Sequence, residues 1–196
     1  MKYPLIIIPS FLEKPFIDFS KKDAENYLNW FLEIKETRID ILRENIKAVY
    51  PNWTADFSLK SFENLNEWLK SIITFRNKTQ EEQRLEQLQL SETPLLKDVI
   101  ESSVYTLSED TTSICFDVGL YFGESLKKIN IGIEWTYKLD PPNYVHYAQP
   151  ILTKKKSKVD LNPRHIMEIT AYKILEGNAN DNEIIRLYEV WNTLLK

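Results

Sequence analysis

The stretch that decides the fold runs from Ile114 to Ile129 and reads ICFDVGLYFGESLKKI. Wound into a helix, it places Cys115, Val118 and Phe122 on one side and further apolar residues on the opposite side. A helix that is apolar nearly all round is typical of a buried position. We therefore expect a central helix over about residues 111–129, with the remaining helices packed around it.

Two of the chain's four glycines lie inside this helix. Each of them costs about 1 kcal/mol relative to alanine in a helix interior, which suggests that their small size is needed. Cys115, Gly119 and Gly123 recur at every fourth position and form a shallow groove along the helix. The spacing predicts that another helix approaches this groove closely.

A narrow polar stripe on the same helix carries its candidate functional residues. Asp117 and Glu124 lie two turns apart on one line, with Tyr121 between them. Such a pair of carboxylates in a half-apolar setting can act as acid and base or bind a cation. The same residues would equally suit the one solvated edge of the helix, with Glu124 paired to Lys128. A third interpretation is that both carboxylates hold the fold through bonds to the Trp135 indole, to tyrosine hydroxyls or to backbone amides.

A β-hairpin is predicted directly after the helix. Apolar and polar residues alternate from Ile133 to Asp140, which indicates a strand with one buried face. A turn cluster, DPPN, follows at residues 140–143, and a second extended run continues from Tyr144 to Thr153. Pro150 within that run favours an edge strand. We expect this antiparallel hairpin, over about residues 133–153, to pack on the central helix.

The rest of the chain is predicted to be mainly helical. Short strands are expected at Leu5–Ile8 and Phe16–Phe19, and capping boxes at Ser20 and Thr79 mark two helix starts. By apolar periodicity, helices are expected at residues 20–49, 58–75, 80–90, 94–105, 163–176 and 184–195. The expected fold class is α+β, mainly α: a helical bundle around the buried central helix with a small antiparallel hairpin, in a single domain of residues 1–196.

Composition limits the partners and the compartment. The formal net charge is −4 and the isoelectric point about 5.4, which disfavours nucleic acids and anionic membrane surfaces as partners. The single cysteine, Cys115, excludes an intrachain disulfide and favours a reducing cytosol. No apolar run approaches the length of a membrane span or of a signal peptide. We expect a cytoplasmic protein.

Motifs for common chemistries are absent from the sequence. It has two histidines, His146 and His165, and no HExxH, paired CxxC, P-loop, GxGxxG or GxSxG sequence. A structural zinc site would need more Cys and His ligands than the chain supplies. Cys115 on an apolar helix face is more typical of a small hydrophobic side chain than of a nucleophile. We therefore expect no catalytic residue, no bound metal and no cofactor.

Two longer stretches form recognisable motifs. Residues 53–68 read WTADFSLKSFENLNEW, and Asp117 to Glu124 read DVGLYFGE, followed by a strand with a tryptophan and by QPIL at residues 149–152. This pattern resembles a family of small bacterial proteins of uncharacterised function. Its members carry a W-x-x-D-[FY]-S-x-x-S-L-x-x-L-x-x-W segment, from which Phe62 departs, and a D-x-x-x-Y-[FL]-G-E helix. The resemblance covers about residues 50–163 and implies a shared fold without a particular activity. Small proteins of this general kind often act as immunity or antitoxin-like partners, by analogy.

Two functions from different classes are consistent with the sequence. The scarcity of catalytic motifs, the acidic charge and the many Trp and Tyr residues favour a non-enzymatic protein-binding module, such as an immunity-type inhibitor. Its candidate contacts would be the stripe of Asp117, Tyr121 and Glu124 and the loop from Asn52 to Asp56.

The alternative is an enzyme, or a small-ligand or cation binder, with a pocket beneath the hairpin. In that pocket Asp117 and Glu124 would act as general base or cation ligands. Its shape would come from Trp135, Tyr144 and Gln149. Carboxylates that line a closed pocket would favour this alternative, whereas carboxylates on a convex rim would favour the protein-binding module.

Overall fold

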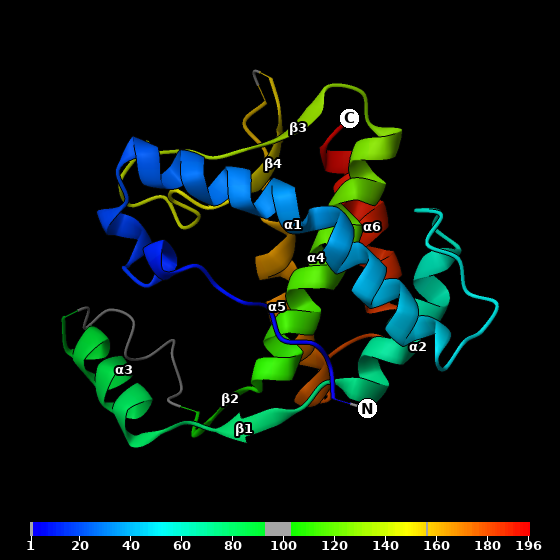
Figure 1. Cartoon of the computed structure of the whole chain (residues 1–196), viewed down its shortest axis with the longest axis horizontal. Helices are drawn as coiled ribbons and strands as arrows, with labels where there is room; N and C mark the ends of the chain where they lie inside the picture. Colours follow the sequence, from blue (N-terminus) through cyan, green and yellow to red (C-terminus); the bar gives the residue numbers. More distant parts are fainter. Residues whose placement is uncertain (1, 93–102, 156) are drawn as a thin grey trace.

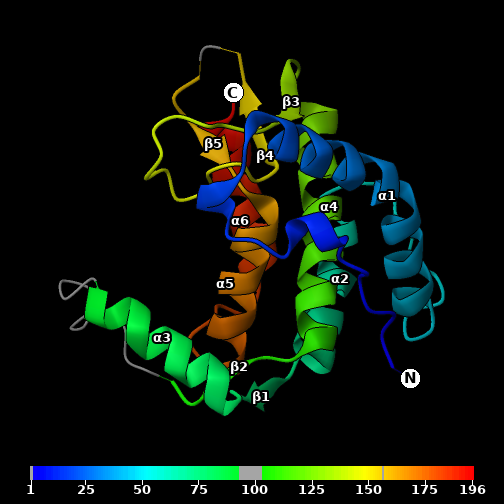
Figure 2. The same ribbon diagram turned by 60° about the vertical axis from the view of Figure 1, so that its left-hand side comes forward.

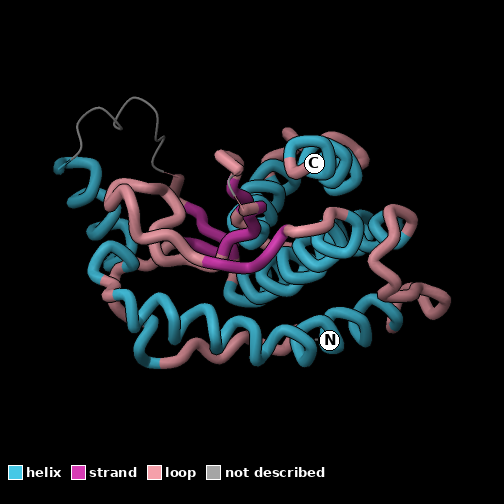
Figure 3. The backbone as a smooth tube through the Cα atoms, turned by 90° about the horizontal axis from the view of Figure 1, so that it is seen from above, coloured by secondary structure: helices cyan, strands magenta, loops and turns pink. Residues whose placement is uncertain are grey.

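The computed structural model describes residues 2–92, 103–155 and 157–196, and it confirms the expected α+β, mainly α class. The helices of this part are α1 (Lys21–Lys47), α2 (Ser61–Ile72), α3 (Gln80–Glu92), α4 (Glu109–Ile129), α5 (Pro163–Leu175) and α6 (Glu183–Leu194). The strands are β1 (Phe75–Asn77), β2 (Tyr105–Leu107), β3 (Ile133–Thr136), β4 (Ile151–Lys154) and β5 (Asp160–Leu161). Two short 3-10 turns, η1 (Ser10–Leu12) and η2 (Phe16–Asp18), precede α1. Seen from above, the strands occupy a small part of a mainly helical molecule (Figure 3).

The helix α4 is central, as its apolar surface predicts. Figure 1 shows α1 crossing in front of α4, and Figure 2 shows α5 and α6 on one side of α4 with α1 on the other. The helix α2 packs against α5 and α6 as well as against α1. From Thr111 to Leu126 the side chains of α4 are almost all buried. The helix begins at Glu109, two residues before the expected start, because the side chain of Ser108 accepts a hydrogen bond from the backbone N–H of Thr111 at 3.2 Å.

The glycine groove on α4 is occupied, as its spacing predicts, by another helix. A Cβ atom at Gly119 would lie 2.8 Å from the Cα atom of Arg164 in the first turn of α5. One turn earlier, the Cys115 thiol donates to the backbone carbonyl of Met167 in α5 at 3.5 Å. Gly123 serves a different neighbour, because a Cβ atom there would lie 2.5 Å from Cζ2 of the Trp135 ring. The small residues therefore let both α5 and the indole reach the backbone of α4.

The predicted hairpin forms, but both of its strands are shorter than expected: the first, expected over residues 133–140, ends at Thr136. β3 and β4 pair antiparallel with Trp135 opposite Leu152, and β5 pairs with the other side of β4. The prediction of an extended run from Tyr144 is wrong up to Pro150, because residues 141–149 form turns. The edge position predicted from Pro150 is also wrong, since β4 lies between β3 and β5. Pro150 comes before the strand, so its missing N–H removes no bond from the ladder.

The N-terminal segment differs from the predicted strands. Residues 5–8 pair with no strand, and their backbone bonds to side chains instead: the Ile6 N–H donates to Oγ of Ser113 at 3.1 Å. Residues 16–18 form η2 rather than a strand. Figure 2 shows this segment, in dark blue, passing across α4 before α1 begins. Side chains of α1 and α4 therefore hold the segment in the absence of a sheet edge.

The boundaries of the helices that the structure describes differ from the expected ones by at most three residues at either end. The capping boxes at Ser20 and Thr79 are confirmed. The helix expected at residues 58–75 begins at Ser61, after a turn at residues 59–60, and ends at Ile72, because β1 follows and pairs with β2. The helix expected from Pro94 to Tyr105 falls mostly on residues 93–102, outside the described residues, and Tyr105 opens β2 instead of ending a helix.

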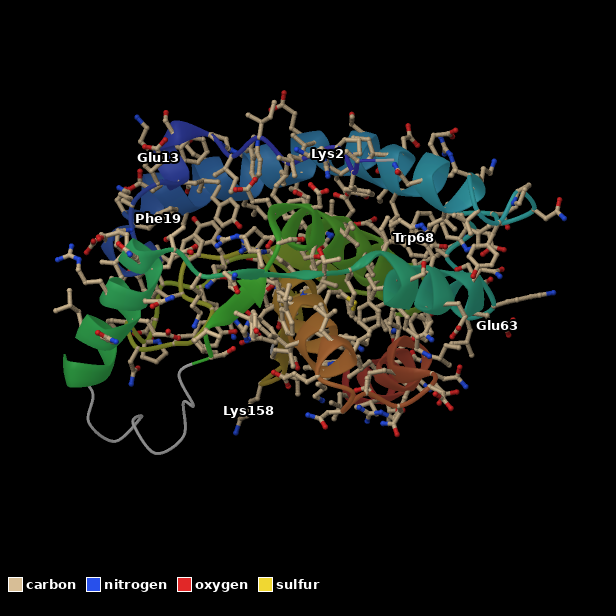
Figure 4. All side chains as sticks on the ribbon, turned by 90° about the horizontal axis from the view of Figure 1, so that it is seen from below. Lys2, Glu13, Phe19, Glu63, Trp68 and Lys158 are labelled. Atoms are coloured by element: carbon tan, nitrogen blue, oxygen red, sulfur yellow. The ribbon has the colours of Figure 1, made fainter. Side chains whose placement is uncertain are left out.

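The hydrophobic core has a main part around α4 and a smaller part beside the N-terminal turns. Trp68 and Phe19, one in each part, are both buried, and Figure 4 shows Trp68 among other side chains, whereas Glu13 and Glu63 lie at the edge of the view. The smaller part joins η2 and the start of α1 to the loop between β3 and β4. None of the described helices is both long and apolar enough to cross a membrane.

The close approaches at Gly119 and Gly123 give a testable consequence. Alanine at an open helix position would add stability, up to about 1 kcal/mol. Gly119→Ala and Gly123→Ala are instead expected to lower the free energy of unfolding by about 1–3 kcal/mol each, because the added methyl group overlaps Arg164 backbone or the Trp135 ring. Urea unfolding of both variants checks this, and a stabilised variant would contradict the packing described here.

Candidate functional site

Asp117 lies inside the molecule and is bonded to two distant segments. Arg38 of α1 donates from Nε to Oδ1 at 2.7 Å and from Nη2 to Oδ2 at 2.8 Å, and the Tyr3 hydroxyl donates to Oδ2 at 2.5 Å. The side chain of Asp117 has no exposed surface. Burial raises the pKa of Asp117 to about 6, although the bonds from Arg38 and Tyr3 act in the opposite direction. In the folded protein this carboxylate is therefore not accessible to a partner or a substrate.

The same arginine also holds the N-terminal backbone. Arg38 donates from Nη2 to the carbonyl of Pro4 at 3.0 Å and from Nη1 to the carbonyl of Leu5 at 3.4 Å. Its guanidinium lies 5.9 Å from the centre of the Tyr3 ring. Arg38 and Asp117 together therefore fasten the N-terminal segment to α1 and α4.

Glu124, at the other end of the stripe, is bonded to Trp135. The indole Nε1–H donates to Oε1 at 2.6 Å, and Nζ of Lys35 on α1 lies 3.1 Å from Oε2. The carboxylate is largely buried, with 18% of the side chain exposed. These contacts correspond to the third interpretation of the sequence, in which the acidic residues hold neighbouring elements together.

Tyr121 anchors the loop before α2. Its hydroxyl accepts a hydrogen bond from the backbone N–H of Phe57 at 2.8 Å and lies 2.7 Å from Oγ of Ser61. The ring stacks on that of Phe57 with centroids 4.8 Å apart. Burial raises the pKa of Tyr121 to about 12. Phe57 has a φ of 62°, which is uncommon for a residue with a side chain, and both contacts with Tyr121 hold it there.

Tyr144 and Gln149 lie in a different place, beside the N-terminus of α5. The Tyr144 hydroxyl donates to Oδ2 of Asp160 at 3.1 Å, and Lys138 donates to the same atom at 2.6 Å. Gln149 accepts from Nδ2 of Asn162, the residue that caps α5, at 3.1 Å. The six residues singled out in the sequence therefore form no single site: four are bonded in the core around α4, and two belong to this loop cluster.

The loop cluster brings together the chain's two histidines. The rings of His146 and His165 have centroids 5.2 Å apart, and Nδ1 of His146 lies 3.4 Å from Nδ2 of Asn162. Burial, followed by the neighbouring His165, lowers the pKa of His146 below its ordinary value of 6.5, while Asp160 opposes this change. Among the described residues, no three His, Cys, Asp or Glu side chains are arranged to hold a metal ion.

A cavity of about 210 Å³ lies between the N-terminal segment, α1, α4 and α5. Its walls are mainly aliphatic and aromatic, with one guanidinium: Ile6, Ile8, Leu12, Phe16, Tyr27, Trp30, Thr112, Phe116 and Arg164. None of the six residues singled out in the sequence lines it. The sequence signals near the cavity are the apolar run at residues 5–8, which lies between two prolines, and the aromatic residue Phe16. Neither signal indicates that these residues form a cavity together with Arg164.

Exposed apolar side chains line this cavity and a neighbouring hollow. A second hollow, lined by Phe16, Ile17, Val145 and residues near them, shares Phe16 with the cavity, which also contains Ile8. We refer to Ile8, Phe16, Ile17 and Val145 together as the N-terminal apolar surface. It joins the N-terminal segment to the loop between β3 and β4.

No family model, no curated protein and no solved structure matches this chain. The family resemblance of residues 50–163 therefore stays a prediction.

The buried Arg38–Asp117 pair predicts the outcome of its removal. Asp117→Asn is expected to lower the free energy of unfolding by about 3–5 kcal/mol, because it leaves a buried guanidinium without its counter-charge. The double variant Arg38→Met, Asp117→Leu should lose less than the two single variants together, because no charge is left unpaired. Urea unfolding measures all three variants.

The exposed Arg84–Glu81 pair provides the control, and Glu81→Gln should change stability by less than about 1 kcal/mol. Mg²⁺ or Zn²⁺ should leave the wild type unchanged. An Asp117→Asn variant as stable as the wild type, together with a metal that stabilises only the wild type, would contradict the structural role.

The lowered pKa of His146 predicts how the stability of the protein depends on pH. Because its pKa is lowered in the folded state, the unfolded chain binds more protons between that pKa and 6.5. His146 therefore costs no stability above pH 6.5, where its ring is neutral in both states. As the pH falls below 6.5, the free energy of unfolding decreases. NMR titration should give a midpoint below 6.5 for His146, assigned by comparison with His146→Gln, whose stability should vary less with pH. A midpoint at or above 6.5 would show that the ring is not buried as described.

Proposed function

We propose that this protein acts by binding another protein, and that the partner docks on the N-terminal apolar surface. The observation that carries the proposal is the gathering of exposed aliphatic side chains around two hollows. Ile8, Ile17 and Val145 are 56%, 58% and 69% exposed. A contiguous set of exposed apolar side chains of this kind is typical of a protein–protein interaction site.

The shape of the surface supports the same proposal. Phe16 stands between the cavity and the second hollow and forms part of the wall of each. A partner that presents an apolar or aromatic side chain can place it in the second hollow, against this ring. Side chains that enter pockets near the centre of an interface supply most of the binding energy. The partner is therefore expected to carry apolar anchors.

Charged residues lie next to the apolar surface. Lys14 pairs with Asp23 at 2.8 Å, and both line a shallow hollow together with Glu13 and residues of η1. An apolar centre with a polar, solvated edge is the usual composition of a protein–protein interface. The arrangement supports a specific partner with polar groups at matching positions.

The contacts and burial of the candidate catalytic groups also support binding over catalysis. Asp117 and Glu124 are bonded within the core, and the Cys115 thiol donates to a backbone carbonyl. Burial raises the pKa of the Cys115 thiol, which disfavours the reactive thiolate. The cavity contains none of these three residues. The function proposed is thus that of a non-enzymatic binding module.

An immunity-type inhibitor of a bacterial protein is the specific form that we propose for this module. The family resemblance of residues 50–163 and the single cysteine support a bacterial, cytoplasmic setting. In that form, the N-terminal apolar surface would cover a site on the partner, and the acidic net charge would favour a basic partner.

Exposed positions allow the docking surface to be tested without disturbing the core. Ile17→Glu and Val145→Glu are each expected to reduce retention of the partner by about tenfold or more, because each buries a charge against an apolar anchor. The measurement is affinity capture from extract of the source cells, with the retained proteins quantified by mass spectrometry.

Ile131→Glu is the matched control, since Ile131 is 93% exposed and lies in the turn between α4 and β3. The proposal requires a protein that wild type and Ile131→Glu retain equally and that both surface variants lose. Capture that is unaffected by Ile17→Glu and Val145→Glu, or no retained protein at all, would refute it.

A further inference from the structure

The cavity beneath the N-terminal segment has an almost continuous aromatic wall. The rings of Phe16 and Tyr27 stack with centroids 5.7 Å apart and an interplanar angle of 3°. Trp30 lies 6.0 Å from Tyr27 and 6.0 Å from Phe116, so four rings follow one another along the wall. The volume of about 210 Å³ is many times the space that one water molecule needs. A wall of this kind suits a small ligand with a flat or aliphatic body.

One charged group, the guanidinium of Arg164, lines this apolar cavity. It is held in place from two sides: Nε donates to Oε1 of Glu168 at 2.8 Å, and Nη1 donates to the Tyr27 hydroxyl at 3.3 Å. Its other terminal nitrogen, Nη2, makes no hydrogen bond within the part of the chain that the structure describes. The arginine is thus oriented by its neighbours and keeps donors available for a ligand.

We propose that this cavity binds a free small monocarboxylate with an aromatic or short aliphatic body. Guanidinium groups form short, charge-assisted hydrogen bonds with carboxylates, and a cation that is already oriented loses little freedom on binding. The position of Arg164 in the first turn of α5 adds to the attraction, because the N-terminal end of a helix favours negative charge. The apolar body of the ligand would lie against the four rings.

The charge around Arg164 favours a single negative charge on the ligand. Glu168 already neutralises one side of the guanidinium, so a second negative charge on the ligand, as on a phosphate dianion, would be repelled. The enclosure of the cavity by the N-terminal segment favours a free molecule over a side chain of a partner protein. Ile6, Ile8 and Leu12 cover it on the side away from the helices.

The binding of phenylacetate and of its neutral isostere phenylacetamide tests this proposal. Both are titrated into the full chain and followed by isothermal calorimetry and by the fluorescence of Trp30, with Trp30→Phe as the spectroscopic reference. Phenylacetate is expected to bind about tenfold more tightly than the amide, a ratio that corresponds to one additional charge-assisted hydrogen bond. Equal affinities, or no binding of phenylacetate, would overturn the proposal.

Two variants test whether the preference for phenylacetate over phenylacetamide arises in the cavity. Arg164→Gln should remove the difference between acid and amide, whereas Arg84→Gln, on the exposed face of α3, should keep it. Leu12→Trp fills the cavity without changing Arg164, and it should abolish the binding of both compounds. This variant provides a result even if Arg164→Gln fails to fold. Unchanged binding by Leu12→Trp would place the ligand elsewhere and overturn the proposal.

Discussion

The buried bond between Arg38 and Asp117 is the contact on which the rest of the structure depends. It joins α1 to α4, and through Tyr3 and the carbonyl of Pro4 it also fixes the N-terminal segment. That segment covers the cavity and carries three of the four residues of the N-terminal apolar surface. Removal of either charge leaves the other without compensation in the interior, where such a charge is costly. An interaction that is purely architectural thus determines where binding can occur.

Local sequence patterns predict the elements of this fold because their causes are local. The apolar residues all round α4 indicate a buried helix, and the spacing of Gly119 and Gly123 indicates a close neighbour, as found with Arg164 and Trp135. The alternation that begins at Ile133 correctly gives β3. Each of these signals comes from residues within a few positions of one another, where the periods of helix and strand apply.

The candidate site could not be predicted in the same way, because its partners are remote. The stripe of Asp117 and Glu124 has the same spacing whether it faces water, a ligand or an arginine. Arg38 and Tyr3, which decide the outcome, lie 79 and 114 positions away from Asp117. The cavity likewise joins the N-terminal segment to Arg164. The run after Tyr144 misleads for a related reason: Tyr147 and Ala148 pack in the smaller part of the core as part of a turn, which resembles a strand only in composition.

The bond from Tyr3 to Asp117 also constrains the order of events during synthesis on the ribosome. The first residues of the chain emerge long before α4, and longer still before α5, so the N-terminal segment has no native neighbours during most of translation. Its isoleucines stay exposed in that interval, as apolar surface of this kind does in partly made chains. The segment that fastens the molecule together is made before the helices that it fastens and docks late, and until it docks its exposed isoleucines are a target for chaperones.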